Sequence, residues 1–144
     1  MKIEYRKGDL MSTDVLHIIH GCNSRGAMNS GVAYAVRNTY PKAYDDYRCV
    51  YNGYGLIIGQ VHPSLQPNGK TIWNAITQDN YGRDANKVYV SYKAIADCFS
   101  AIDGEMEEIA MPLIGSGLAN GDWGVISAII ENTLVKTKPI AYIL

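Results

Sequence analysis

The stretch "HIIHGCNSRGAMNSGVAYAVRNTYPKAY", residues 17–44, passes from an apolar run through a loop of small residues into a helical pattern. The apolar run is nearly continuous, which is typical of a strand covered on both faces in a parallel or mixed sheet. The small residues of the loop let the backbone approach a ligand closely. The helical pattern stops at Pro41. A strand that enters a helix in this way predicts an α/β domain with ligand contacts at the carboxyl edge of its sheet.

Strand and helix patterns alternate along the rest of the chain. Short apolar runs predict strands at residues 2–7, 14–20, 54–62, 71–77, 108–114 and 140–144. Helical spacing predicts helices at residues 30–41, 41–51, 87–102 and 122–136, the last capped by Asp122. The sequence "PNGK" at 67–70 predicts a hairpin turn. This alternation, without a repeat or a linker, predicts one three-layer α/β/α domain over residues 1–144.

The composition is that of a soluble globular domain. Hydrophobic residues make up 47% of the 144 residues and charged residues 19%, so the chain can bury a core without disulfides or metal. The formal net charge of −1 gives no general attraction to nucleic acid or to an anionic membrane, and neither is expected as a direct partner. A bound anion must therefore be held locally, by backbone amides or by a single side chain.

The cysteines carry no metal signature. Cys22, Cys49 and Cys98 form no CxxC pair, and with the three histidines they show no zinc-ligand spacing, so no metal and no cofactor is expected. An odd set of free thiols fits a reducing compartment. The N-terminal residues lack the apolar segment of a signal peptide, so a cytoplasmic location is expected.

A second loop, "IGSGLANGDW" at 114–123, also leaves a strand and enters a helix. Gly115, Gly117 and Gly121 allow positive φ, and consecutive amides in such a turn form a nest for anions. The helix that begins near Trp123 adds its positive end. No GK[ST] follows, so this is not a Walker A loop. An ordinary glycine-rich turn that packs a strand against a helix is the equal alternative.

His20 is predicted to end its strand, where its imidazole would emerge at the carboxyl edge of the sheet. An imidazole there suits proton transfer near neutral pH, although a buried histidine bonded to a carbonyl is slightly favoured by the pattern alone. Asn23 offers a donor and an acceptor to a sugar hydroxyl. In "KGDL", Asp9 could accept from an exocyclic amine and Leu10 could donate to a ring nitrogen, or Asp9 is a turn residue. The polar segment 77–84 is expected to form a lip over the site or to be merely solvated.

The ordered set "KGDL", "IIHGCNSRGAMNSGVAYAVRNTYPKAYDDY", "MPLIGSGLANGDW" and "IAYIL" resembles a macro domain. It is most similar to the branch of ADP-ribose 1″-phosphate phosphatases and related ADP-ribosyl-glutamate hydrolases, and small phage-encoded proteins also carry such domains. The resemblance covers residues 1–144 and is densest at 18–48 and 111–123. It implies a mixed, roughly six-stranded sheet. It also implies a ligand that is ADP-ribose, its 1″-phosphate or an ADP-ribosylated protein.

The resemblance assigns roles to individual positions. Asp9 would take the adenine amine, Leu10 would meet the ring, and Asn23 would hold the distal ribose. Gly31, Val32 and Ala33 would cradle one phosphate. The other phosphate would lie against Ser116, Gly117, Leu118 and Ala119. His20 matches the catalytic histidine of the phosphatase branch. Further ligand contacts are predicted at Gly21, Ser30, Gln78, Gly115 and Asn120.

Two positions depart from the glutamate hydrolases. The segment "ITQDN" lacks their lysine, and Ala119 stands where they have an aspartate, which argues against a lysine-adduct mechanism. The expected function is hydrolysis of the terminal phosphate of ADP-ribose 1″-phosphate, with His20 as general acid or as the group that positions and deprotonates water. The alternatives are a non-catalytic module that binds ADP-ribose or ADP-ribosylated protein, and a de-ADP-ribosylating hydrolase.

Overall fold

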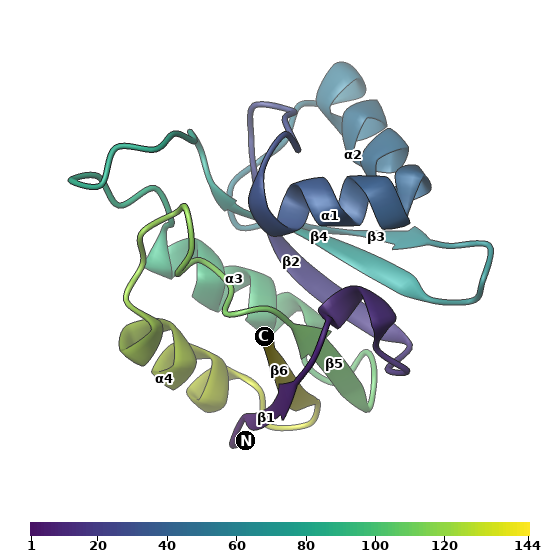
Figure 1. Cartoon of the computed structure of the whole chain (residues 1–144), viewed down its shortest axis with the longest axis vertical. Coiled ribbons are helices and arrows are strands. Elements are labelled where there is room, and N and C mark those ends of the chain that lie inside the picture. The colour runs from purple at the N-terminus through teal and green to yellow at the C-terminus, as the bar shows by residue number, and fades with distance from the viewer.

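One mixed sheet runs through the middle of the computed structural model, which describes residues 1–144 (Figure 1). Its order is β1-β6-β5-β2-β4-β3, and all neighbouring strands are parallel except the β3–β4 pair. The carboxyl ends of the five parallel strands therefore lie along one edge. The strands are β1 (Glu4–Lys7), β2 (His17–Asn23), β3 (Val61–Leu65), β4 (Thr71–Gln78), β5 (Glu108–Met111) and β6 (Lys138–Ile143).

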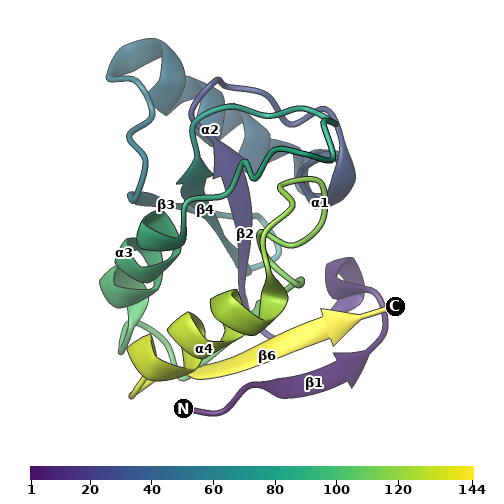
Figure 2. The ribbon, with the colours of Figure 1, turned by 90° about the vertical axis from the view of Figure 1, so that its left-hand side faces the viewer.

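Two pairs of helices cover the two faces of this sheet (Figures 1 and 2). Helices α1 (Gly31–Thr39) and α2 (Pro41–Gly53) pack on the face that presents Ile18 of β2. Helices α3 (Tyr92–Ile102) and α4 (Trp123–Thr133) pack on the face that presents Ile19, because successive strand residues point to opposite faces. A short 3₁₀ helix, η1 (Leu10–Ser12), follows β1. The predicted α/β/α domain with a mixed six-stranded sheet is confirmed.

The local signals at several element ends are also confirmed. The Asp122 side chain caps α4 by accepting from the Val125 amide at 3.3 Å, and Pro41 is the first residue of α2. The 67–70 turn joins β3 to β4 as predicted. No helix of the protein combines the length and apolar character needed to cross a bilayer.

The predicted strand at 54–62 is wrong for most of its length. Residues 54–60 form a loop in which Gly55 and Gly59 have φ of +80° and +92°, values that interrupt an extended strand. Ile57 and Ile58, the apolar residues behind the prediction, are exposed. Only the last two predicted residues belong to β3, which starts at Val61.

The predicted helix at 87–102 begins five residues later, at Tyr92. The Ser91 hydroxyl caps it by accepting from the Ala94 amide at 3.1 Å. The residues before it are extended: Val90 pairs with Gln78, and the Tyr89 amide donates to the Ala119 carbonyl at 2.8 Å. Hydrogen bonds to other segments therefore override the helical spacing of this stretch.

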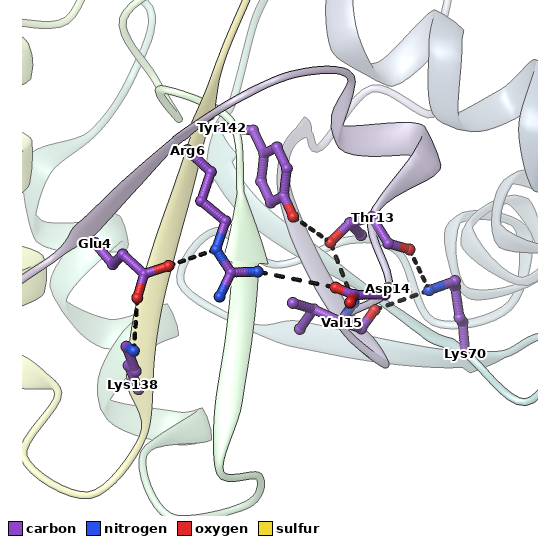
Figure 3. Close-up of polar contacts among 8 residues, drawn as sticks. All are labelled: Glu4, Arg6, Thr13, Asp14, Val15, Lys70, Lys138 and Tyr142. Atoms are coloured by element: carbon purple, nitrogen blue, oxygen red, sulfur yellow. Dashed lines mark hydrogen bonds and ion pairs between the residues drawn. The ribbon is translucent and has the colours of Figure 1, made fainter.

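Polar contacts fasten the β1 edge to the hairpin side of the molecule (Figure 3). Lys70, next to the hairpin turn, donates to the carbonyls of Thr13 and Val15 at 2.6 and 3.0 Å. The Thr13 and Tyr142 hydroxyls are 2.7 Å apart, which ties the segment before β2 to β6. These bonds hold the chain between β1 and β2 in place.

Candidate functional site

A cleft of about 1100 Å³ opens above the carboxyl ends of β5, β2 and β4. Its 22 lining residues come from the ends of β2 and β4, the start of α1 and the three loops at 24–30, 79–91 and 112–122. The chain leaves β2 toward α1 on one face, whereas it leaves β4 and β5 toward α3 and α4 on the other. Figure 2 shows the loops after β4 and β5 arching past the arrowhead of β2. Such a switch point is where open α/β sheets bind ligands.

One wall of the cleft is the first turn of α1, Gly31 to Ala33, here called the α1 turn. Ser30 caps the helix in an extended conformation without a side-chain hydrogen bond. The amides of Gly31, Val32 and Ala33 donate to no acceptor in the protein. Gly31 has φ of +63°, which a residue with a side chain adopts only at a cost. The α1 turn therefore presents three free N–H groups at the positive end of a helix.

The opposite wall is the segment Gly115 to Ala119, here called the glycine turn. Its amides at Gly115, Gly117, Leu118 and Ala119 also donate to no acceptor in the protein, whereas the Ser116 amide donates to Leu113. Gly115 has φ of +78°. A Cβ built on Gly31 would lie 3.6 Å from Cδ1 of Leu118, so the two turns face each other closely across the cleft. Together they offer seven free amides.

The floor of the cleft contains a polar group, the Thr77 hydroxyl, and leaves no room for a side chain at Gly21. A Cβ on Gly21 of β2 would lie 2.7 Å from the Thr77 hydroxyl of β4. That hydroxyl is buried and has no hydrogen-bond partner in the protein. A buried hydroxyl without a partner is unusual and marks a place where a polar ligand can complete the hydrogen bonding.

Most of the predicted contact residues line this cleft, although a common lining does not test their roles. The lining members of the predicted set are Gly21, Asn23, Ser30, Gly31, Val32, Ala33, Gln78, Gly115, Ser116, Gly117, Leu118 and Ala119. Asp9, Leu10, Asn120 and His20 do not line it.

The prediction that His20 emerges at the cleft is wrong. Strand β2 continues three residues past His20, so its imidazole lies on the α1–α2 face of the sheet and is fully buried. Asn74 donates through Nδ2 to the Ala43 carbonyl at 3.1 Å, which leaves its Oδ1 to accept from Nε2 of His20 at 2.7 Å. Burial lowers the pKa of His20 to about 4. The imidazole is therefore neutral near pH 7 and lies beneath the cleft lining, where it contacts Cys22 but does not itself line the cleft.

Asn23 lines the cleft, but its side chain is mostly engaged within its own loop. Oδ1 accepts from the Arg25 amide at 3.0 Å and from the Tyr47 hydroxyl at 3.0 Å, and Nδ2 donates to the Ala27 carbonyl at 2.9 Å. One N–H of Nδ2 remains for a ligand. Asn23 thus shapes the loop that leads to the α1 turn.

Asp9 and Leu10 lie at the same sheet edge, after β1, but outside the cleft. The exposed Asp9 carboxylate accepts from the Met11 amide at 2.9 Å and caps η1, so it fills the role of a turn aspartate. The Leu10 side chain is buried in the core with Val36 and Tyr40.

Asn120 connects two loops instead of lining the cleft. Its Nδ2 donates to the carbonyls of Asp84 and Lys87 at 3.0 and 2.8 Å, and it is the one residue other than glycine with positive φ, +59°. The loop 79–91, called the lip from here on, is thereby fastened to the end of the glycine turn. We call this pair of bonds the Asn120 clasp.

The lip supplies three of the ten lining residues that position-by-position prediction missed. Tyr81, Gly82 and Arg83 line the cleft with the predicted Gln78. The polar run at 77–84 indicated a lip, but it did not say which side chains reach the cleft. No group of three histidine, cysteine or acidic side chains is placed to hold a metal ion.

This chain belongs to the macro domain family, whose model matches residues 19–130. A protein of Enterobacteria phage T4, "Uncharacterized 17.5 kDa protein in tk-vs intergenic region", is 26% identical over 146 residues, 96% of this chain and 94% of its own. A Bacteroides thetaiotaomicron protein of unknown function superposes with a TM-score of 0.89 at 26% identity, over 100% of this chain and 99% of that chain. Thermosipho africanus DarTG, solved in complex with ADP-ribose, superposes with a TM-score of 0.77 at 16% identity; the match covers 98% of this chain and 42% of that chain. The family expected from the sequence is confirmed.

Proposed function

We propose that the cleft binds ADP-ribose. The observation that carries this proposal is the set of seven free backbone amides on two turns that face each other across a narrow gap. Opposed amide nests suit a diphosphate, because each phosphate accepts several N–H bonds without a lysine or a metal ion. The small residues of both turns leave room for the backbone to approach the phosphates.

The comparisons support the choice of this diphosphate. The macro domain family matches the segment that contains both turns. A protein with the same fold, Thermosipho africanus DarTG, was solved with ADP-ribose. The unpartnered Thr77 hydroxyl on the floor adds a polar contact beyond the turns.

The test is a thermal-shift comparison of ADP-ribose with ADP, AMP and NAD. Ligand at about 100 times its dissociation constant should stabilise the fold by about 2.7 kcal/mol. ADP-ribose should shift the melting temperature more than the other three at equal concentration. Equal shifts from all four nucleotides, or none, would contradict the proposal.

A more specific hypothesis is that the protein hydrolyses ADP-ribose 1″-phosphate with His20 as the general acid. His20 is buried and does not line the cleft, which argues against that role. We therefore propose recognition without rapid turnover, with the ligand free or attached to a protein. Purified protein incubated with ADP-ribose 1″-phosphate should release no phosphate above the buffer rate. Phosphate release that survives in a His20→Gln variant would restore the phosphatase hypothesis with a different acid and leave ADP-ribose recognition in place.

A further inference from the structure

The two edges of the sheet are protected to different degrees. An edge strand presents backbone N–H and C=O groups with which a strand of another chain can pair. At the β3 edge, Pro63 stands in the middle of the strand, and its missing N–H removes a donor from the free edge. Strand β1, at the other edge, contains no proline and no bulge, and no segment lies beyond it in Figure 2. The β1 edge is therefore open to another strand.

The outward backbone groups of β1 belong to Tyr5 and Lys7. The Gly8 amide donates to the Ile143 carbonyl of β6 at 2.8 Å, so every second residue before Gly8, back to Glu4, also faces β6. Tyr5 and Lys7 lie between those residues, and their N–H and C=O groups point away from the sheet. The free edge thus offers two donors and two acceptors within one short strand.

The charges of β1 suit a second copy of the same strand. Charged side chains usually protect an edge, because they repel like charges on an approaching strand. Glu4 and Arg6, however, have opposite signs and lie on the same face of the sheet, where they form an ion pair (Figure 3). In an antiparallel pair centred on Tyr5, Glu4 of each copy would lie opposite Arg6 of the other. The two ion pairs would then join in one network of four charges, which stabilises more than isolated surface pairs do.

We infer that two copies of this chain pair through β1, antiparallel about a two-fold axis at Tyr5, so that their six-stranded sheets become continuous. The surface is self-complementary, as a two-fold interface requires. At Tyr5 each copy donates to the other and accepts from it, and each Lys7 amide donates to the Ile3 carbonyl of the other copy. These bonds leave in place the bond from the Ile3 amide to the Glu131 carboxylate, 2.8 Å long.

The face of β1 opposite to the charges adds an aromatic contact. The Tyr5 side chain is 50% exposed, and its hydroxyl accepts from Nε1 of Trp123 at 3.0 Å, which holds the ring in place. Pairing centred on Tyr5 sets the two rings directly opposite each other, and cross-strand aromatic pairs stabilise a sheet. The ring that is half-exposed in one copy is therefore covered by its equivalent in the other.

The paired edge lies away from the cleft. Strand β6 separates β1 from β5, which is the nearest strand whose end carries the cleft, and no residue of β1 lines it. Because the two copies of β1 run antiparallel, the carboxyl edges of the two sheets point in opposite directions. The two clefts would therefore open on opposite sides of the dimer, and ADP-ribose should leave the association unchanged. The inference stands independently of the proposed function.

Sedimentation equilibrium of the untagged chain over a wide range of concentrations tests the pairing. An interface of this small size should give a dissociation constant in the micromolar range. Arg6→Glu and Glu4→Arg each set like charges opposite each other, so each variant alone should self-associate at least about tenfold more weakly than the native chain. A mixture of the two variants restores opposite charges across the axis and should form a heterodimer about as stable as the native dimer.

Lys93→Glu is the matched control. It makes the same change of charge as Arg6→Glu, but on α3, where Lys93 pairs with Asp97 at 2.7 Å and the helix packs against β3 and β4. Its self-association should equal that of the native chain. Thermal melting verifies that each variant is folded.

Hydrogen exchange in the native protein gives a readout that needs no variant. Exchange of the Tyr5 amide hydrogen should slow as the protein concentration rises, because pairing covers this donor. A native chain that stays monomeric, or Tyr5 exchange that is independent of concentration, would overturn the inference. So would native association in both single variants, or variants whose mixture stays monomeric.

Discussion

The two faces of the sheet are built differently. Beneath α1 and α2 the interior contains a polar layer, in which His20 bonds to Asn74 and the Tyr47 hydroxyl donates to the Asn23 carbonyl at 2.6 Å. Beneath α3 and α4 lies a cluster of 17 buried apolar residues, Phe99 and Ile126 among them. The two faces meet at the cleft, and each contributes one of its amide turns.

The α1 turn and the glycine turn also differ in what holds them in shape. The α1 turn has free amides and little that holds it from outside, since its N-cap side chain makes no bond. The glycine turn is closed by the Gly121 amide, which donates to the Gly115 carbonyl at 2.8 Å, and by the Asn120 clasp. Val90 and Ile126 of the apolar face pack under it. The comparison teaches that one turn owes its shape to local helix geometry and the other to tertiary contacts.

The largest expected effect is a loss of folding stability at low pH, caused by the buried His20 in the polar layer. In the folded state the pKa of His20 is about 4 because of burial, and in the unfolded state it is 6.5. Below pH 6.5 the unfolded chain binds a proton that the folded chain does not, so stability falls as the pH falls. Between pH 6.5 and 4.5 the loss should be about 2.2 kcal/mol.

Urea unfolding at a series of pH values measures this loss in the native protein and in His20→Gln. The variant should lose the His20 share and show a flatter profile. Equal losses in both proteins would assign the proton uptake to His17 and His62, whose pKa values burial also lowers.

Gly121→Ala tests the contacts that hold the glycine turn against the face of the sheet covered by α3 and α4. The new Cβ would lie 2.6 Å from the Gly115 carbonyl oxygen and 2.6 Å from Val90, contacts that force the turn apart. The free energy of unfolding should fall by about 2 kcal/mol, as for other overpacked sites. Gly117→Ala, within the glycine turn itself, is the control, because its Cβ meets nothing within 4 Å. Thermal melting measures both variants. Similar losses of stability in the two would contradict the view that close contacts at Gly121 hold the turn.

Gly31→Ala tests the α1 turn, where the strain is local. A side chain at φ of +63° should cost about 1 to 2 kcal/mol of stability. Relief of that strain would turn the free amides of the α1 turn away from the cleft, so ADP-ribose affinity should fall about tenfold. Gly53→Ala, at the end of α2 with open space around it, should leave affinity at the native value. Calorimetry with ADP-ribose separates the two variants.

The smallest expected effect concerns the Asn120 clasp. Asn120→Gly keeps the positive φ without strain and removes both bonds to the lip. Amide hydrogens of the lip, such as that of Tyr89, should exchange roughly fivefold faster, equivalent to about 1 kcal/mol of local stability. Exchange rates in the α1 turn should not change. An unchanged lip would mean that the Gln78–Val90 pairing and the bond from the Tyr89 amide to the Ala119 carbonyl are enough to hold it.

The sequence is a good guide wherever local rules decide the structure. Asp122 as a cap, Pro41 at a helix start and the 67–70 hairpin are recognised because each satisfies a backbone need within a few residues. The same holds for the two amide turns, whose small residues reveal that the backbone itself is exposed. The run at 54–62 is mistaken because an apolar composition does not say whether a segment is buried.

The functional side chains are harder to assign than the turns. His20 is three residues from the end of its strand, and a boundary error of that size changes which atoms reach the edge. Asn120 was expected to touch the ligand and instead bonds to a segment more than 30 residues away. Arg83 carries no motif of its own.

By itself, the sequence determined the family, the α/β/α order and the two stretches where backbone amides are left free. These follow from hydrophobic period, glycine freedom and capping, which act over a few residues. Only the tertiary structure decided that His20 does not line the cleft, that Asn120 holds the lip and that Arg83 lines the cleft. Those outcomes depend on the end of a strand and on contacts between distant loops, and both are set by packing of the whole chain.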